Sequence, residues 1–330
     1  MKNLIYFLIQ IILINSYSIP TITRKKFMDI YICSNLNFNL NNPKILIISC
    51  DKIGFDIANK FFLNPISATT TKPKRLNELN KANINPILIP QMENKDDENF
   101  RKAIINNDII IIADTISIFS IHTYYRTCVR VANAIAYKSK IYPNKKTKIF
   151  LISSVNCYGA RTDGAEVNEL SPIANQILDT SNDKSWSINH YAIALMIRKA
   201  EEVLLGIKGT MILRTAMIWN DAIKNEFINF NYKKTYPNSL GKTYISLTTT
   251  NKIANIIYKG IQEDLSGIYN IASLPITRKE LLEKYINFIN WVDNDNLLNN
   301  DYYYAIDNKP NLPNCMRFNM IINSNNYIRL

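Results

Sequence analysis

The stretch from Ser49 to Gly54 carries the residue types best suited to binding a phosphate group. It reads Ser-Cys-Asp-Lys-Ile-Gly and lies between an apolar run and a segment with apolar residues at helical spacing. A short turn that joins a buried strand to a helix presents free backbone N–H groups and the positive end of a helix dipole to a pyrophosphate. We therefore predict a dinucleotide contact through Ser49, Cys50, Asp51, Lys52, Ile53 and Gly54.

The glycine fingerprint of such turns is incomplete here. The pattern G-x-G-x-x-G supplies one glycine for the turn, one for phosphate approach and one for helix packing, and Ser49, Asp51 and Gly54 occupy those places. A carboxylate about 4 Å from a phosphate charge costs about 4 kcal/mol at an effective dielectric constant near 20. A helix N-terminus stabilises a nearby anion by at best ~2 kcal/mol. Binding therefore requires that Asp51 turns away or that Lys52 neutralises it, and the alternative is a strand-turn-helix unit without a ligand.

The elements around this turn predict an α/β fold. Ile45 to Ile48 has the length and β-branched content of a strand buried on both faces, and Phe55 to Phe62 has the spacing of a helix. Strands and helices then alternate along the chain, which predicts right-handed crossovers and a parallel sheet. Further strands are expected at 66–71, 84–89, 108–114 and 148–154, and helices at 76–82, 100–105 and 115–140.

We expect one Rossmann-type, doubly wound parallel sheet with a small C-terminal lobe on the substrate side, over residues 44–330. Ala113, at the end of the clearest buried strand, is a further candidate contact for the cofactor. Toward the C-terminus, Thr250 is a candidate helix N-cap, and Thr277 with Glu280 forms a capping box.

The exit of the second strand indicates which dinucleotide is favoured. NAD-binding proteins place an acidic residue there for the ribose 2′-hydroxyl. This sequence has Thr71 and Lys72, followed by Lys74 and Arg75. A 2′-phosphate suits these charges better than a 2′-hydroxyl, so NADP is preferred to NAD, and a solvated basic turn is the alternative.

Several later segments resemble the extended and atypical short-chain dehydrogenase/reductases, the NAD-dependent epimerase/dehydratase group. Residues 153–159 read Ser-Ser-Val-Asn-Cys-Tyr-Gly, and Glu169-Leu-Ser-Pro follows; three more matching segments lie at 198–205, 211–218 and 267–272. The resemblance covers nearly all of the body, from Lys44 to about Ile322. It implies a Rossmann fold, NAD(P), and a redox, epimerase or dehydratase reaction on a small carbonyl compound or sugar nucleotide.

The same resemblance implies a set of catalytic residues. In that family a serine binds the reacting oxygen of the substrate, and the resemblance places it at Ser154. Its general acid/base is a Tyr, and a Lys four residues later lowers the Tyr pKa, because an unperturbed Tyr titrates near 10. A spacing of four places both side chains on one helix face.

The sequence departs from that Tyr-Lys pattern. Tyr191 is followed four residues later by Leu195, and alignment of the helix puts Ile193 or Ala194 at the Tyr position and Ile197 or Arg198 at the Lys position. Tyr191 and Arg198 share a helix face but lie ~10.5 Å apart along the axis. The candidate catalytic residues are Ser154, Tyr191 and Arg198; the alternative is a helix that packs Tyr191, Leu195 and Ile197 into the core.

Two functional interpretations follow. One is an NAD(P)-dependent enzyme; the other is a non-catalytic Rossmann-fold protein that serves as a binding or scaffold surface. The net charge of +12 leaves room for RNA or an acidic protein as the partner of the second. The basic clusters are short and carry no interleaved aromatic residues, so the sequence holds no linear nucleic-acid motif.

The N-terminus has the features of a targeting segment. Residues 1–18 combine Lys2, an apolar run too short to span a bilayer comfortably and a small-x-small exit, which predicts a cleaved signal peptide and no membrane span in the mature chain. An uncleaved anchor is the alternative. Residues 19–43 are rich in Asn, Thr, Ser and basic residues, like an organellar transit segment. The combination resembles apicomplexan proteins sent to the apicoplast, which implies a plastid location.

Cysteine and histidine usage predicts neither a disulfide framework nor a metal site. The five cysteines are scattered and form no C-x-x-C pair, and the two histidines, His122 and His190, lie far apart without ligand-spaced companions.

Overall fold

The computed structural model describes residues 42–89, 98–114, 116, 120–158, 166–171, 184–231, 235–237, 244–273, 275–286, 290–292 and 321–322. The chain divides into two units, 1–37 and 38–330, and all described residues belong to the second. The expected signal peptide and nearly all of the expected transit segment lie outside the described residues.

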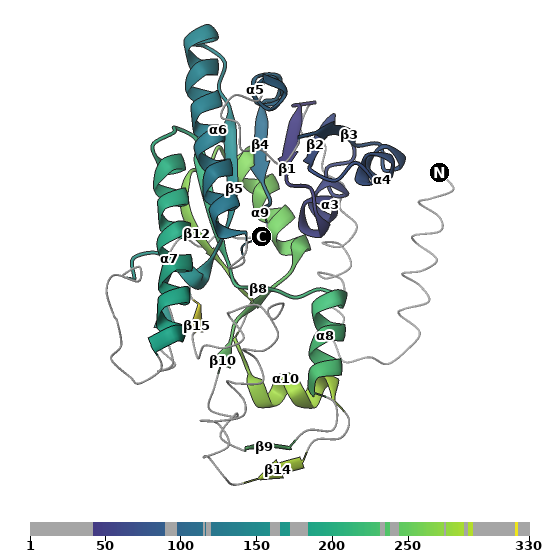
Figure 1. Ribbon diagram of the computed structural model, residues 1–330, viewed down its shortest axis with the longest axis vertical. Helices are drawn as coiled ribbons and strands as arrows, with labels where there is room; N and C mark the ends of the chain where they lie inside the picture. The colour runs from purple at the N-terminus through teal and green to yellow at the C-terminus, as the bar shows by residue number, and fades with distance from the viewer. Residues whose placement is uncertain are drawn as a thin grey trace, which may run out of the picture. The chain divides into compact units, whose positions relative to one another are not determined.

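A seven-stranded sheet forms the centre of the second unit (Figure 1). Its order is β12-β7-β5-β4-β1-β2-β3, and every neighbouring pair is parallel. This confirms the predicted α/β, Rossmann-type, doubly wound fold. The strands are β1 (Ile45–Ile48), β2 (Ile66–Thr70), β3 (Asn85–Leu88), β4 (Ile109–Ile112), β5 (Lys148–Ser154), β7 (Thr210–Thr215) and β12 (Gly267–Ile271).

Helices cover both faces of this sheet because alternate strand residues point to opposite faces. Leu46 and Ile48 of β1 pack in the cluster that includes α5, α6 and α7, whereas Ile45 and Ile47 pack in the cluster that includes α3, α4 and α9. Figure 1 shows α6 and α7 side by side on one face. These helices are α3 (Lys52–Ala58), α4 (Arg75–Lys81), α5 (Glu98–Ile105), α6 (Ile121–Ile141), α7 (Lys184–Leu205) and α9 (Thr250–Gln262).

A smaller group of elements gathers apart from the sheet (Figure 1). Trp219 joins two of them, because its ring lies 5.6 Å from the ring of Phe227 on α8 and 5.3 Å from the ring of Tyr285 on α10. The group consists of α8 (Asp221–Asn231), α10 (Arg278–Tyr285) and the paired strands β9 (Thr235–Pro237) with β14 (Asn290–Val292). Short pairs complete the described structure: β6 (Glu166–Val167) with β15 (Ile321–Ile322), β8 (Met217–Ile218) with β11 (Leu247–Thr248), and β10 (Tyr244–Ile245) with β13 (Ile276–Thr277).

One helix cap is placed correctly by the sequence and one is not. Thr277 and Glu280 form the predicted capping box at the start of α10. The cap of α9 is Thr249 rather than Thr250, because the Thr249 hydroxyl accepts the bond from the Lys252 backbone N–H. Three threonines in succession make that boundary ambiguous in the sequence.

Gly260 allows α9 to lie close to the sheet, and this gives a first testable prediction. A Cβ at Gly260 would lie 2.6 Å from the Met211 sulfur and 2.9 Å from Cε1 of Phe150. We expect Gly260→Ala to lower the free energy of unfolding by about 1–3 kcal/mol, because a Cβ overpacks this contact. Gly206→Ala is the matched control, since a Cβ there meets no atom within 4 Å. Urea unfolding measures both, and equal effects of the two variants would contradict this role for Gly260.

Lys138 on α6 is a buried amine that ties α6 to the end of α5. Its side chain is 1% exposed, and Nζ donates to the carbonyl oxygens of Asn107 at 2.6 Å and Ile104 at 3.4 Å. Burial lowers the pKa of Lys138 to about 8, and the positive charge of Lys145 adds to the effect. Charging this amine therefore opposes folding at neutral pH.

The Lys138 amine predicts a stability that rises with pH. Between about 8 and 10.5 the unfolded chain binds more protons at this site than the folded chain, so the free energy of unfolding increases across that window. The full gain is about 3 kcal/mol, at 1.36 kcal/mol per pKa unit. Urea unfolding of the natural chain and Lys138→Met at pH 7 and pH 9.5 tests this, because Met removes only this titration. The stability difference between the two proteins should change with pH, and a constant difference would contradict the prediction.

Candidate functional site

The turn after β1 is held by the neighbouring strand. Ser49 has φ 59°, in the left-handed region, and its backbone N–H donates to the Thr69 hydroxyl at 3.0 Å. The Cys50 N–H donates to the Thr69 carbonyl at 3.1 Å. A serine takes the conformation that a glycine adopts freely, at a cost of roughly 1–2 kcal/mol. Thr69 on β2 thus fixes the sharp bend that the fingerprint predicts at this place.

Gly54 brings α3 against the sheet. An added Cβ would lie 3.0 Å from Cγ2 of Ile47 on β1 and 3.5 Å from the Cβ of Ala113 beyond β4. Gly54 therefore performs the packing role of the third fingerprint glycine. Ala113, a candidate cofactor contact, is 1% exposed and packs in the same core cluster.

Asp51 occupies the N-cap position of α3 without capping it. Its backbone is extended, at φ −78° and ψ −157°, and its side chain makes no cap hydrogen bond. Among the described contacts no salt bridge joins Asp51 to Lys52, which is exposed. Lys52 therefore does not neutralise the carboxylate in this structure, and the charge at the second glycine position still opposes a pyrophosphate.

Arg75 links the exit of β2 to the turn after β1. Its Nη2 donates to the Cys50 carbonyl at 2.9 Å, and its Nε is buried without a hydrogen-bond partner. Glu78 lies 3.8 Å from Nη1, a long contact with a carboxylate that is largely exposed. Thr71 and Lys72 are exposed beside it. The structure thus places a cation within reach of both the turn and the exit of β2.

The described cysteines are unsuited to thiolate chemistry. Cys50, Cys128 and Cys157 are free and buried. Burial raises the pKa of Cys50 to about 12, although Arg75 opposes the shift. Within the described residues no three His, Cys, Asp or Glu side chains gather as a metal site, and no helix has the length and apolar character needed to cross a bilayer.

Ser154 is the last residue of β5 and lies at the carboxyl edge of the sheet. Its hydroxyl accepts a hydrogen bond from the Asn156 backbone N–H at 3.2 Å. The preceding residue is tied to β7, since the Thr215 hydroxyl donates to the Ser153 carbonyl at 2.8 Å. The strand end that carries Ser154 is therefore tied to β7 and to the turn that follows.

Arg198 is paired with a carboxylate on its own helix. Nε of Arg198 donates to Glu202 at 2.6 Å on a partly exposed face of α7. Tyr191 is part of α7, and its side chain lies outside the described part of the structure. Ile193 and Ile197 are 3% and 0% exposed and belong to the core. At these two positions, four residues apart, the helix buries apolar groups.

A buried ion pair beneath the site was missed by sequence reasoning. Arg214 on β7 and Glu201 on α7 are 1% and 2% exposed, and Nη2 of the guanidinium lies 2.7 Å from Oε2 of the carboxylate. Nε of Arg214 donates to both carboxylate oxygens, at 3.1 and 3.2 Å. The Ser153 hydroxyl donates to Oε1 of Glu201 at 2.6 Å. The pair thus supports the residue next to Ser154.

The pair extends into a network that reaches the last strand of the sheet. Nη1 of Arg214 donates to the Tyr158 hydroxyl at 3.0 Å, and that hydroxyl donates to Oδ1 of Asn270 at 2.8 Å. Tyr158 closes the 3₁₀ turn η1 (Val155–Tyr158) that follows β5. The Asn270 backbone N–H donates to Glu169 at 2.7 Å, which anchors the segment after β6.

Tyr158 and Arg214 do not replace the missing Tyr-Lys pair. Burial raises the pKa of Tyr158 to about 12, and the lowering effect of Arg214 does not reverse it. The Tyr158 side chain is 3% exposed, and its oxygen is already bonded to two partners. A general acid/base needs access to substrate and a pKa nearer the working pH, so this tyrosine stabilises the fold.

Comparison with known proteins gives a fold and no closer relation. Neither a family model nor a curated protein matches the chain. Among solved structures, a functionally unknown protein from Silicibacter pomeroyi superposes with a TM-score of 0.56 at 12% identity, over 86% of this chain and 89% of that one. The terminal R domain of a myxalamid PKS-NRPS pathway gives 0.58 at 13%, over 85% and 80%.

A putative epimerase from Burkholderia cenocepacia gives a TM-score of 0.53 at 13% identity, over 77% of this chain and 84% of that one. Likeness at such low identity concerns the path of the backbone. It agrees with the strand order, the parallel pairing and the two helical layers. The chain therefore has a Rossmann-type α/β fold of the kind found in these epimerase and R-domain structures.

Proposed function

We propose that this chain binds a nicotinamide dinucleotide, NADP in preference to NAD, at the carboxyl edge of β1, β2 and β4. The observation that carries the proposal is the position of Arg75, whose guanidinium contacts the turn after β1 and keeps a buried Nε without a partner. An unpaired buried N–H is unfavourable, and the Arg75 side chain, which is 21% exposed, is accessible to a phosphate oxygen that would accept from it. The residues at the β2 exit fit a 2′-phosphate.

The fit is weaker at the pyrophosphate. There the N–H groups of Ser49, Cys50 and Asp51 are already donated within the protein, which leaves the first N–H groups of α3 for the ligand. Asp51 lies beside them with no neutralising partner in the described contacts. Lys72 and Lys74 add exposed positive charge beside Arg75. The adenosine side of the ligand therefore contributes more of the affinity than the pyrophosphate side.

For chemistry we propose a redox, epimerase or dehydratase reaction on a small carbonyl compound or sugar nucleotide. A bound nicotinamide supplies or accepts the hydride. Ser154, anchored at the end of β5, holds the reacting oxygen. Tyr191 moves the proton. Arg198 lowers the pKa of Tyr191 only after it leaves Glu202, because Arg198 and Glu202 are bonded at 2.6 Å in the structure.

A second candidate is a dinucleotide-binding protein without catalysis. Ile193 and Ile197 favour it, because they bury apolar side chains at two positions where the resemblance places the Tyr-Lys pair. Turnover separates the two candidates. Oxidation of added NADPH by a panel of small carbonyl compounds supports the enzyme, and its abolition in Ser154→Ala assigns the site. Binding of NADPH with no turnover of any compound supports the second candidate.

The central test of the proposal is Arg75→Gln. We expect the natural chain to bind NADPH more tightly than NADH, and the variant to lose at least tenfold in NADPH affinity while NADH affinity changes little. Charge-assisted hydrogen bonds to phosphate are about twice as strong as neutral ones, which gives the discrimination. Isothermal titration calorimetry measures both ligands. Arg101→Gln is the matched control, because Arg101 lies on α5 and its guanidinium is over the Tyr137 ring of α6. Equal affinities of the natural chain for NADPH and NADH would overturn the preference for NADP.

A further inference from the structure

The edge of the sheet opposite the candidate cofactor site carries a row of lysines. In a parallel sheet all strands begin at one edge, and β7, β5, β4 and β1 are neighbours in that order. Lysines lie at or just before three of these four strand starts, so the fold brings together charges that are far apart in the sequence. We call this set the amino-edge lysine row: Lys44 before β1, Lys145, Lys146 and Lys148 at β5, and Lys208 before β7.

Backbone contacts show that the strand starts adjoin one another. The Asp108 N–H donates to the Lys44 carbonyl at 2.9 Å, and the Lys148 N–H donates to the Asp108 carbonyl at 2.9 Å. A Cβ built on Gly209 would lie 3.6 Å from the Thr147 carbonyl, which places the start of β7 beside that of β5. The row therefore runs across four adjacent strands.

Two carboxylates of the described residues lie in this row, and each already forms an ion pair with a lysine. Asp108 pairs with Lys145 at 3.4 Å, and Asp264 pairs with Lys148 at 2.8 Å. The bond and charge of Lys148 lower the pKa of Asp264, with further contributions from Lys146 and Lys208. Within the described contacts Lys44, Lys146 and Lys208 form no salt bridge. The row keeps a surplus of positive charge.

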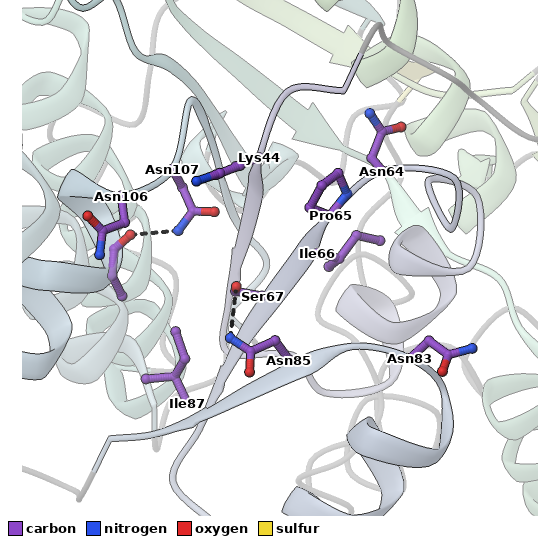
Figure 2. A pocket seen from close by; sticks show the side chains of 11 residues that line it. Lys44, Asn64, Pro65, Ile66, Ser67, Asn83, Asn85, Ile87, Asn106 and Asn107 are labelled. Carbon is purple, nitrogen blue, oxygen red and sulfur yellow. Dashed lines mark hydrogen bonds between the residues drawn. The ribbon is translucent and has the colours of Figure 1, made fainter.

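A pocket of about 720 Å³ lies at the β1 end of the row (Figure 2). Figure 2 shows Lys44 and Asn107 on one side and Ser67 with Asn85 on another, joined by the bond from Asn85 Nδ2 to Ser67 Oγ at 3.3 Å. None of its lining residues is acidic. Five asparagines line the pocket: Asn64, Asn83, Asn85, Asn106 and Asn107. Asn64 and Asn107 are buried, and Nδ2 of Asn107 already donates to the Ala103 carbonyl at 2.7 Å. The exposed amides, each with a donor and an acceptor group, are those of Asn83, Asn85 and Asn106.

Exposed aromatic side chains lie at the end of α6 next to the lysines. Tyr142 is 49% exposed, and its carbonyl accepts the bond from the Lys145 N–H at 3.0 Å. Tyr137, five residues earlier, is 44% exposed and has the Arg101 guanidinium 5.0 Å from its ring centre. Exposed rings beside cations are platforms on which unpaired bases stack.

We propose that the amino edge binds single-stranded RNA, with phosphates along the lysine row and one base in the amide pocket. Lysines attract the phosphate backbone without regard to sequence. Asparagine amides pair with base edges, and unpaired RNA bases are free to enter a pocket. An acidic protein would contact the lysines, but its carboxylates would not account for the amide pocket or the exposed tyrosines. This surface is on the edge opposite Arg75, so the RNA proposal does not depend on the cofactor proposal.

The test measures binding of the full chain to short, fluorescently labelled oligoadenylate and oligouridylate between about 50 and 200 mM salt. Three unpaired lysines predict a log–log salt slope of about −2, since each neutralised phosphate contributes about −0.7 for a single strand. Lys146→Gln with Lys208→Gln should lower affinity about tenfold at low salt and reduce the slope by about 1.4. Asn85→Ala should weaken binding at least fivefold and leave the slope unchanged, because amides contact bases rather than phosphates.

Controls separate this surface from general charge and from the other edge. Lys72→Gln with Lys74→Gln removes two exposed lysines at the opposite edge and should leave RNA binding unchanged. Circular dichroism and thermal melting of each variant confirm that it is folded. The proposal is overturned if the natural chain binds neither RNA at low salt, if the two lysine pairs have equal effects, or if polyglutamate of similar length displaces the RNA as well as unlabelled RNA does. Arg75→Gln should change NADPH affinity without changing RNA affinity.

Discussion

Glu201→Gln is expected to lower the free energy of unfolding by about 3–5 kcal/mol, the usual cost of leaving one partner of a buried ion pair uncompensated. The carboxylate is 2% exposed, accepts three bonds from Arg214 and one from Ser153, and lies between α7 and the sheet. The amide cannot balance the guanidinium charge. Its NH2 group is a donor, so it cannot accept the hydrogen bonds that one carboxylate oxygen accepts in the natural chain. Urea unfolding measures the loss.

The adjacent residue supplies the control. Glu202 pairs with Arg198 at 2.6 Å, but its side chain is 55% exposed. Exposed helix pairs contribute only about 0.3–0.5 kcal/mol, so Glu202→Gln should have little effect. Replacing the buried pair together, as Glu201→Leu with Arg214→Met, should recover part of the loss, because no unpaired charge is then left. Similar costs for Glu201→Gln and Glu202→Gln would contradict the buried-pair interpretation.

Asp51→Asn is expected to raise the affinity for NADPH at least tenfold. A carboxylate near a pyrophosphate repels it by up to about 4 kcal/mol at an effective dielectric constant near 20, and screening by solvent reduces this for a partly exposed group. The amide keeps the size and polarity of the side chain and removes the charge. Because Asp51 makes no cap bond in the structure, α3 loses little when the carboxylate is replaced.

Isothermal titration calorimetry with NADPH tests this prediction, and Asp56→Asn is the matched control. Asp56 belongs to the same helix, five residues further along, or ~7.5 Å along its axis. Its removal changes the net charge equally but acts from a greater distance. If both variants gain the same affinity, the effect is one of net charge, and Asp51 has no special place at the phosphate. If neither gains, the pyrophosphate does not lie at this turn.

The sequence predicts the sheet well because the strands that form its centre are continuous apolar runs. Ile45–Ile48 and Ile109–Ile112 are buried on both faces. Helix limits are less well predicted. The helix expected from Leu76 begins at Arg75, and the segment expected from Phe100 begins at Glu98. Polar first turns carry little periodicity, so the pattern does not mark them.

The candidate site is predicted in part. Gly54 and the bend at Ser49 follow from local spacing, and Ser154 is what the family resemblance implies; the structure has each of them at the carboxyl edge. The contact between Arg75 and Cys50 joins residues 25 apart, which no local pattern predicts. Arg214 carried a usable signal, since an arginine inside the buried run Met211–Thr215 requires an acidic partner. Its partner, Glu201, has no such mark in the sequence.

The length of the central strands determines how the two proposed sites influence one another. Strand β1, which both sites share, has four residues, so Lys44 before it and Ser49 after it lie five steps apart, or roughly 17 Å at about 3.3 Å each. This is about twice the Debye length of about 8 Å at physiological salt. A charged ligand at one edge therefore leaves the electrostatic potential at the other nearly unchanged, and the free energies of the two binding events add. Occupancy of the nucleotide edge then neither recruits nor expels a polyanion from the far side, and the chain can carry both at once.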